Sequence, residues 1–395
     1  MMKFKYRAVA FVLLFTLFYI LLSHYFNINV RLKSFFPLEN KVNLISRKKV
    51  NLNTNYLHYN IKYQYNTKSM QDNNILNSLK IKIVLAVVAC GDRLHETLMM
   101  IKSAILFGIK NDLKIVVIAD HELIQSFKEK LNEWKELMNN TFSFELHPIA
   151  FPIAEENEWR KLFKPCASQR LFLPNVLPHI DSVLYVDTDT LFLAPLDDIW
   201  SYFKAMNSSQ MAALAPEHED PNTGWYNRFA RHPFYGKLGV NSGVMLMNLT
   251  RMRQFKWEKY LSPIYKEFKL KITWGDQDII NIIFHYHPEK LLQYSCRYNY
   301  RPDHCMYMSV CHDAVDRGVA VVHGSRGAFH GNKHPVFQSI YRTMEEFQLG
   351  SDVYENFLLP LESYLDQTTD TNCGKVRKIF TKNIQHLIEQ KETYR

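Results

Sequence analysis

The sequence predicts an α/β domain built on a mostly parallel sheet, and three observations support this fold class. Apolar runs of strand length alternate with amphipathic stretches of helix length from residue 81 onward. The first run, residues 81–90, is continuously apolar, which is typical of a strand buried on both faces of a parallel sheet. Several runs end in carboxylate or imidazole residues, as expected where parallel strands reach a common ligand-binding edge.

The expected elements follow one another along the chain. Strands are expected at residues 81–90, 113–120, 142–149, 183–186, 211–217, 241–248 and 318–325. Helices are expected at residues 94–107, at 123–138, within 275–286 and over most of the last sixty residues. The helix within 275–286 has Asp276 and Asp278 in its first turn, where the helix dipole favours carboxylates.

The N-terminal arm predicts a membrane anchor. Basic residues precede an apolar run, and residues 8–26 as a helix would span about 28 Å, close to the hydrocarbon thickness of a bilayer. No small-residue cleavage site follows the run, which favours an uncleaved signal-anchor over a signal peptide. We therefore expect a cytoplasmic tail at residues 1–7, an anchor in the lipid bilayer at 8–26 and a polar stem at 27–80.

The positive net charge of the chain, +9, belongs to this arm. Residues 1–80 contain 12 Lys and Arg against 2 Asp and Glu, whereas residues 81–395 contain 36 against 37. A globular part without excess positive charge gives no support for a nucleic-acid-binding surface, so no nucleic-acid partner is expected.

Cysteines and glycosylation sequons indicate an oxidising compartment. Disulfides, with a pairing that the spacing leaves open, are expected among Cys296, Cys305, Cys311 and Cys373. Cys90 and Cys166 are interpreted as buried thiols. Sequons begin at Asn139, Asn207 and Asn248. Together with the anchor, these features predict a single-pass type II protein of the endoplasmic reticulum or Golgi membrane, with its main domain in the lumen.

A divalent-cation site is predicted at the strand ends. Asp187 and Asp189 follow the strand at 183–186 and would point to one face if that strand continued through them. His323 ends the last expected strand. Carboxylate oxygens with one imidazole suit Mg²⁺ or Mn²⁺, and such a cation commonly binds a nucleotide diphosphate. For the Asp-x-Asp triplet alone, a water-exposed strand end is the simpler alternative.

A hydrolase is the second hypothesis. The stretch LYVDTDTL, residues 184–191, also fits the apolar-DxDxT signature of haloacid-dehalogenase-type phosphatases. In those enzymes the residue at Asp187 would be a phosphoryl-accepting nucleophile and that at Asp189 a general acid. That motif normally opens its domain, whereas here a long strand-and-helix pattern precedes it from residue 81 onward.

Longer motifs carry a family resemblance. YVDTDTLFL and PLDDIW, with CGDRLHET, NSGVMLMN, ITWGDQDIIN and the late HG, resemble glycosyltransferase family 8, the glycogenin-like retaining enzymes. FKPCASQRLFLP, NYRPDHCMY and HGSRGAFH are similar to the glucoside xylosyltransferases within that family. The resemblance covers roughly residues 81–385. It implies a GT-A catalytic domain at residues 81–348 and a C-terminal helical extension at 349–395.

The resemblance implies an activity as well as a fold. It implies transfer of xylose from UDP-xylose, with Mn²⁺ (or Mg²⁺), in α1-3 linkage to O-linked glucose on EGF-like repeats such as those of Notch. A glucosylated EGF-repeat protein would then be the partner. Transfer from another UDP-sugar and a catalytically silent glycan-binding protein are the alternatives. Retention leaves two routes open: entry of the acceptor on the face that UDP leaves, or a covalent intermediate on Asp276 or a neighbour.

The resemblance finally implies roles for single residues. The metal ligands would be Asp187, Asp189 and His323, and the catalytic residues beside the phosphates and sugar would be Arg170, Asp276 and Gln277. The other donor-binding residues would be Ala89, Cys90, Gly91 and Asp92 near the uridine, Asn241 and Ser242 in the sugar pocket, and Thr188, Gly324 and Arg326 around the metal and phosphates. Arg326 stands close to where many members have a phosphate-gripping lysine.

Overall fold

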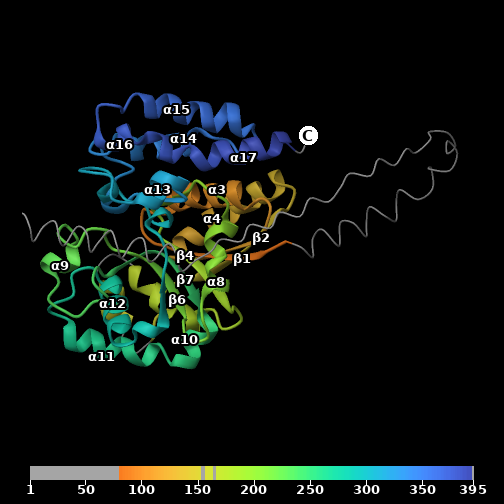
Figure 1. Ribbon diagram of the computed structural model, residues 1–395. Helices are drawn as coiled ribbons and strands as arrows, with labels where there is room; N and C mark the ends of the chain where they lie inside the picture. Colours follow the sequence, from red (N-terminus) through yellow and green to blue (C-terminus); the bar gives the residue numbers. More distant parts are fainter. Residues whose placement is uncertain (1–79, 153–155, 163–165, 394–395) are drawn as a thin grey trace, which may run out of the picture. The chain divides into compact units, whose positions relative to one another are not determined.

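The computed structural model describes residues 80–152, 156–162 and 166–393 (Figure 1). Its main sheet has seven strands in the order β3-β2-β1-β4-β7-β6-β8. They are β1 (Lys82–Ala89), β2 (Asp112–Ala119), β3 (Phe142–Pro148), β4 (Ser182–Val186), β6 (Ala212–Pro216), β7 (Val240–Asn248) and β8 (Leu291–Gln293). The first six expected strands are confirmed to within one residue at each end, while β8 was not expected.

Strand direction places several chain ends at one edge of this sheet. β1 pairs in parallel with β2 and β4, β2 with β3, and β6 with β8. β7 runs antiparallel to its neighbours β4 and β6. The amino end of β7 therefore lies at the same edge as the carboxyl ends of β1, β4 and β6. The expected α/β fold with a mostly parallel sheet is confirmed.

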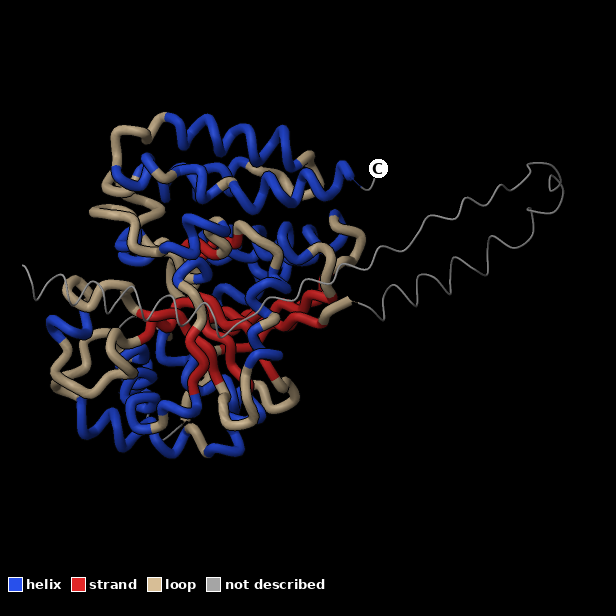
Figure 2. The backbone as a smooth tube through the Cα atoms, viewed as in Figure 1, coloured by secondary structure: helices blue, strands red, loops and turns tan. Residues whose placement is uncertain are grey.

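Both faces of the sheet are covered, which explains the continuous apolar run of β1. Its alternate residues enter two separate hydrophobic cores, Ile83 and Leu85 on one side and Val84 and Ala86 on the other. α3 and α4 pack on the first side, and α11 and α12 on the second. Figure 2 shows the strands with helices on both sides.

The helices include the two expected between the first strands and the one expected from residue 276. They are α3 (Leu94–Gly108), α4 (His121–Leu137), α5 (Glu156–Lys161), α6 (Leu173–Val176), α7 (Leu196–Trp200), α8 (Tyr202–Ala205), α9 (Trp225–Phe229), α10 (Leu249–Phe255), α11 (Glu258–Phe268), α12 (Asp276–Tyr286), α13 (His312–Arg317), α14 (Pro335–Glu346), α15 (Leu359–Asp366), α16 (Asn372–Lys375) and α17 (Lys382–Thr393). A 3-10 helix, η2 (Ala167–Phe172), precedes α6.

The last expected strand belongs to a second, two-stranded sheet. β5 (Thr190–Phe192) pairs antiparallel with β9 (Val321–His323), and Thr190 lies opposite His323. β5 is the apolar run that follows the Asp-x-Asp triplet. The prediction that His323 ends a strand is confirmed, but this strand lies outside the main sheet, and its pairing with β5 brings His323 next to that triplet.

The chain after residue 348 is helical, as expected, and shares the core of the preceding domain. Phe357, Leu361 and Ile384 are fully buried in the same hydrophobic cluster as the outer helices of the sheet. α14 packs on α3 and α15 packs on α14, so these helices extend one side of the structure in layers (Figure 1).

The predicted tail, membrane anchor and nearly all of the predicted stem lie outside the described residues. Within the described ranges, no helix combines the length and the hydrophobicity that a membrane span requires.

Candidate active site

A cavity of about 380 Å³ opens at the edge where β1, β4 and β6 end and β7 begins. Its lining contains all but two of the predicted site residues: Cys90, Gly91, Asp92, Arg170, Asp187, Thr188, Asp189, Asn241, Ser242, Asp276, Gln277, His323 and Arg326. The exceptions are Ala89, whose side chain is fully buried in the core, and Gly324. Gly324 acts on the site indirectly, because its N–H donates a 2.7 Å hydrogen bond to the Asp189 carbonyl.

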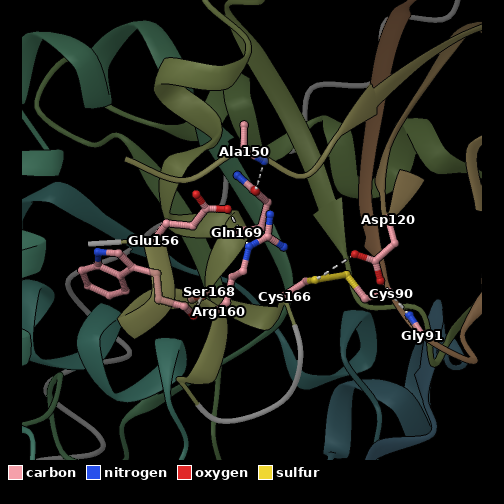
Figure 3. The surroundings of a disulfide bond; sticks show 10 residues. Cys90, Gly91, Asp120, Ala150, Glu156, Arg160, Cys166, Ser168 and Gln169 are labelled. Carbon is pink, nitrogen blue, oxygen red and sulfur yellow. Dashed lines mark hydrogen bonds and ion pairs between the residues drawn. A yellow bond between two sulfur atoms is a disulfide. The ribbon is translucent and has the colours of Figure 1, made fainter. Parts of the chain in front are cut away.

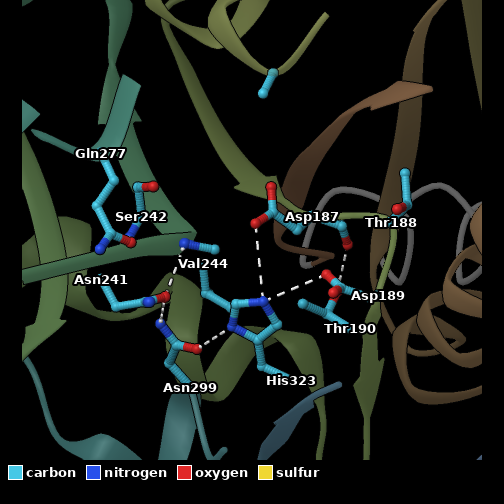
Figure 4. A network of polar contacts seen from close by, with 12 residues as sticks. Asp187, Thr188, Asp189, Thr190, Asn241, Ser242, Val244, Gln277, Asn299 and His323 are labelled. Atoms are coloured by element: carbon cyan, nitrogen blue, oxygen red, sulfur yellow. Dashed lines mark hydrogen bonds and ion pairs between the residues drawn. The ribbon is translucent and has the colours of Figure 1, made fainter. Parts of the chain in front are cut away.

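Asp187, Asp189 and His323 form a cluster of three potential metal ligands in the cavity wall. Their ligand atoms lie within 4.8 Å of one another. His323 Nε2 is 3.3 Å from Asp189 Oδ1 and 3.8 Å from Asp187 Oδ2, between the two carboxylates (Figure 4). Two carboxylate oxygens and one imidazole nitrogen fit a divalent cation such as Mn²⁺.

The strand at residues 183–186 does not continue through the two aspartates, so strand alternation is not what brings them together. β4 ends at Val186, so Asp187 and Asp189 lie on the turn between β4 and β5 rather than on alternate positions of one strand. Two hydrogen bonds hold this turn: the Asp187 N–H donates to the Gly243 carbonyl at 2.8 Å, and the Thr190 hydroxyl to the Asp187 carbonyl at 2.9 Å.

Two asparagines orient His323. Its Nδ1 lies 2.8 Å from Asn299 Oδ1, and Asn299 Nδ2 donates at 2.8 Å to Asn241 Oδ1 (Figure 4). The Gly243 N–H donates to that same Asn241 oxygen, at 3.0 Å, which fixes the polarity of the chain of bonds. Nδ1 of His323 therefore carries the hydrogen, and the lone pair of Nε2 faces the carboxylates, as in a histidine that binds metal.

The close approach of Gly243 to His323 yields a prediction. A Cβ added at Gly243 would meet the imidazole Cε1 at 2.1 Å, so Gly243→Ala must displace the ring. We expect Mn²⁺ affinity to fall about 10- to 100-fold, as when a metal-binding histidine loses its orientation. Mn²⁺ titration followed by electron paramagnetic resonance measures this. Gly331→Ala is the control, because its Cβ would meet only a carbonyl oxygen at 3.8 Å. Equal affinity in both variants would contradict the geometry.

Arg170 links the cluster of potential metal ligands to the start of α12. η2 places it in the cavity wall, where only 4% of its surface is exposed. Its Nη2 donates to Asp187 Oδ1 at 2.6 Å, and its Nη1 donates to the Ser242 carbonyl at 2.7 Å. The guanidinium also stacks over the ring of Tyr185, 4.4 Å from its centroid. These contacts with the backbone, a carboxylate and a ring together fix the orientation of the Arg170 guanidinium.

Asp276 is the second carboxylate beside Arg170. Its Oδ2 lies 2.6 Å from Arg170 Nε, in an ion pair without hydrogen-bond alignment, since Nε donates to the Ala167 carbonyl. Burial raises the pKa of Asp276 to about 6, although the neighbouring guanidinium lowers it. Burial of a carboxylate at a cavity wall is a common property of functional sites.

Gln277 lines the cavity next to the first residues of β7. Its Oε1 accepts a 3.1 Å hydrogen bond from the Ser242 N–H, and its Nε2 donates to the Tyr226 hydroxyl at 3.2 Å. Asp278, by contrast, is fully buried and accepts from the N–H groups of Thr273 and Trp274 at 2.7 and 2.8 Å. Asp278 therefore stabilises the backbone at the start of α12, as expected for a carboxylate in the first turn of a helix. Asp276 faces the cavity instead.

Thr188 and Arg326 line the cavity but make structural contacts with their side chains. The Thr188 hydroxyl donates to Glu96 Oε2 at 3.2 Å, which ties the aspartate turn to α3. Arg326 is half exposed, has a left-handed backbone (φ 60°) and forms an ion pair with Asp303. Its contact with a phosphate stays a prediction, and the Asp303 carboxylate would compete with that phosphate for the guanidinium.

The interpretation of Cys90 and Cys166 as buried thiols is wrong, because they form a disulfide at the cavity wall (Figure 3). This bond joins the end of β1 to the segment that carries Arg170. Next to it, the Gly91 N–H donates to Asp120 Oδ2 at 3.0 Å. Oxidised sulfurs are not metal ligands, so the group of Cys90, Asp120 and Cys166 carries no metal site. The other pairs, which spacing left open, are Cys296–Cys311 and Cys305–Cys373.

Removal of the Cys90–Cys166 disulfide is expected to loosen the cavity wall. The bond closes a long loop, 76 residues in sequence, so Cys90→Ser combined with Cys166→Ser should lower the free energy of unfolding by about 2–4 kcal/mol. We also expect weaker UDP binding, because the segment with Arg170 loses its link to β1. Urea unfolding and UDP titration measure the two effects. Stability within about 0.5 kcal/mol of the parent would contradict a stabilising role.

Sequence reasoning missed several cavity residues, among them Glu217, Trp274 and Arg301. Arg301 is buried next to Glu217, at a pair distance of 3.2 Å. Arg301 lies within NYRPDHCMY, a motif quoted for the family resemblance, but the sequence held no signal that brings it to Glu217. Asn299, the partner of His323, lies in the same motif and was missed for the same reason.

The solved structure of a galactosyltransferase, LgtC, in complex with donor and acceptor sugar analogues has a similar fold. Its TM-score is 0.53 at 17% sequence identity, over 69% of this chain and 100% of that chain. At this identity the likeness concerns the fold alone, and it confirms the expected GT-A-like α/β architecture.

Sequence comparisons give the family. The model for glycosyl transferase family 8 matches residues 50–325. Glucoside xylosyltransferase 1 of Homo sapiens is 51% identical over 329 residues, 80% of this chain and 74% of that protein. Glucoside xylosyltransferase 2 of Mus musculus is 50% identical over 319 residues, 78% of this chain and 72% of that protein. These matches exclude the phosphatase hypothesis. The chain belongs to glycosyl transferase family 8 and is a glycosyltransferase.

Proposed function

We propose that the enzyme transfers xylose from UDP-xylose, with retention, to O-linked glucose on EGF-like repeats. One observation carries the proposal: a cavity with the ligand cluster of Asp187, Asp189 and His323 beside a buried arginine, in a chain half identical to glucoside xylosyltransferases. The glucosylated acceptor and the xylosyl donor are taken from the names of these relatives and from the family resemblance.

The metal ligands of this proposal are Asp187, Asp189 and His323, and Mn²⁺ is the proposed ion. A divalent cation bound there would supply a Lewis acid that stabilises negative charge on the departing UDP. The protein holds the ligands in advance: Asn299 fixes the imidazole, and Arg170 and the hydroxyl of Tyr185 contact Asp187 Oδ1 at 2.6 and 3.2 Å. Such prior orientation avoids reorganisation during the reaction.

Arg170 and Asp276 act on the reacting centre. Arg170 presents a permanently charged group to the donor's phosphates, and its contacts with Asp187 and Asp276 hold it there. Asp276 faces the bound sugar in this proposal. Because Oδ2 of Asp276 is already paired with a guanidinium, the carboxylate is a poor nucleophile. We therefore favour entry of the acceptor hydroxyl on the face that UDP leaves over a covalent intermediate on Asp276.

Disulfides and exposed sequons support a proposed lumenal setting. We propose a type II orientation, anchored by residues 8–26, with the catalytic domain in the lumen of the endoplasmic reticulum or Golgi. Three disulfides among the described residues suit an oxidising lumen. Two of the sequon asparagines, Asn139 and Asn207, are exposed, whereas Asn248 accepts a hydrogen bond from the Arg251 N–H at the start of α10.

A donor panel tests the proposed substrate. The purified full-length protein, in detergent with Mn²⁺, is incubated with a glucosylated EGF repeat and either UDP-xylose, UDP-glucose, UDP-galactose or UDP-N-acetylglucosamine. We expect mass spectrometry to detect addition of one pentose, and a linkage analysis to report an α bond. Addition of a hexose or N-acetylhexosamine, without pentose transfer, would assign the enzyme to another donor.

A further inference from the structure

Arg301 is a buried cation with unused hydrogen-bond donors in the cavity wall. Only 3% of its surface is exposed, and its Nη1 donates to Glu217 Oε1 at 3.2 Å. Its Nε and Nη2 have no hydrogen-bond partner among the described residues. Buried guanidinium N–H groups without partners are costly and rare, so a pair of them at a cavity calls for a ligand.

Glu217 pairs with this arginine, and the carboxylates of Glu219 and Asp303 also interact with it electrostatically. Glu217 Oε2 accepts a 3.2 Å hydrogen bond from the Trp225 N–H, so both carboxylate oxygens have defined donors. Trp225 packs edge-on against Trp274, with ring centroids 5.6 Å apart, and Trp274 lines the cavity. An aromatic wall beside a paired carboxylate and guanidinium offers the apolar surface and the fixed polar groups that a polyhydroxylated ring needs.

The order of the strands places Glu217 and the Cys90–Cys166 disulfide on opposite sides of the potential metal ligands. Along the edge, Cys90 follows β1, Asp187 follows β4, Ser242 is at the start of β7, and Glu217 follows β6. In the proposed function these positions hold, in turn, the uridine, the metal and phosphates, and the transferred sugar. The next position along the edge, at β6, then belongs to the acceptor.

We propose that Glu217 and Arg301 form the acceptor-sugar subsite, in which Arg301 Nε and Nη2 donate to hydroxyls of the acceptor glucose. This inference rests on the proposed function, because it takes the uridine and sugar positions from it. The strongest competing ligand is the donor diphosphate, since the Tyr300 carbonyl before Arg301 accepts from the His323 N–H at 2.8 Å. The place of the pair disfavours that ligand, because Glu217 follows β6, two strands away from β4, whose end holds the metal and phosphates in the proposed function.

The experiment separates acceptor binding from donor binding. Initial rates are measured for the full-length enzyme, Arg301→Gln and Glu217→Gln, with a glucosylated EGF repeat and UDP-xylose varied in turn. In both variants we expect the KM of the acceptor to rise about tenfold or more, the loss of a hydrogen bond to a charged group. The KM of UDP-xylose and the slow hydrolysis of UDP-xylose without acceptor should stay within about twofold. Arg342→Gln, at an exposed pair on α14, is the matched control.

Two further measurements keep the outcomes distinct. UDP with Mn²⁺ is titrated into each variant, and thermal unfolding reports whether Arg301→Gln folds; if it does not, Arg301→Lys and Glu217→Gln carry the test. A raised KM of UDP-xylose or weaker UDP binding, with an unchanged acceptor KM, would overturn the subsite and assign Arg301 to the phosphates. Failure of the parent enzyme to use UDP-xylose would instead refute the proposed function, and the comparison is then made with the donor that it does use.

Discussion

Asp189→Ala is expected to lower the rate of sugar transfer by about a thousandfold or more. In the proposed site, the substitution removes one of three protein ligands and would leave the cation with Asp187 and His323. Charge stabilisation by a bound metal contributes several kcal/mol to such a transition state, and each 1.36 kcal/mol is about tenfold in rate. The measurement is kcat with saturating donor and acceptor at a fixed Mn²⁺ concentration, with UDP affinity measured in parallel.

The position of Asp189 makes this result specific. Only 16% of its side chain is exposed, and its Oδ1 faces His323 Nε2. Asp370→Ala, at an exposed aspartate after α15, should change neither kcat nor UDP affinity. If Asp189→Ala kept more than a tenth of the parent's rate, Asp189 would not be a metal ligand.

Arg170→Gln is expected to lower both activity and stability. It leaves the carboxylates of Asp187 and Asp276 in the cavity wall without the guanidinium that both contact. Breaking a buried ion pair by removal of one partner costs about 3–5 kcal/mol. Urea unfolding in the presence of EDTA measures this cost without metal, and initial rates with Mn²⁺ measure the loss of activity.

The pH dependence of that cost has a defined sign. Burial holds the pKa of Asp276 at about 6, above its usual value, and loss of Arg170 must raise it further. A buried carboxylate with a raised pKa lowers the free energy of unfolding as the pH rises from its unfolded-state pKa to its folded-state pKa. Over this range the unfolded state releases the proton that the folded state retains. The destabilisation by Arg170→Gln should therefore be larger at pH 8 than at pH 5.

A second substitution distinguishes structure from function. Addition of Asp276→Asn to Arg170→Gln removes one unpaired buried charge and should recover part of the lost stability without recovery of activity. Equal stability of the parent and Arg170→Gln at both pH values would contradict the buried ion-pair network.

Much of the fold could be predicted because it depends on local pattern. Apolar runs set the first six strands to within one residue, and Asp276 and Asp278 marked the first turn of α12. β5 and β8 were missed, since each is only three residues long and is defined by its partner rather than by its own sequence.

The candidate site was predictable where a motif carried it and not where tertiary contact did. Asp187, Asp189 and His323 were predicted from the strand ends and from the family motifs, and Arg170 from the family motifs alone; the structure brings the four together. The sequence could not show that Cys90 and Cys166, 76 residues apart, would be bonded, nor that Arg301 would face Glu217. Such pairs join segments whose proximity depends on the strand order, which no local pattern encodes.

The central claim, that Asp187, Asp189 and His323 hold a divalent cation that binds the donor's diphosphate, has one direct test. UDP is titrated calorimetrically into the full-length protein with Mn²⁺, with EDTA, and with Mn²⁺ after His323→Ala. We predict binding in the first titration and at least about a hundredfold weaker binding in the other two. UDP affinity that is the same with Mn²⁺ and with EDTA would contradict the account.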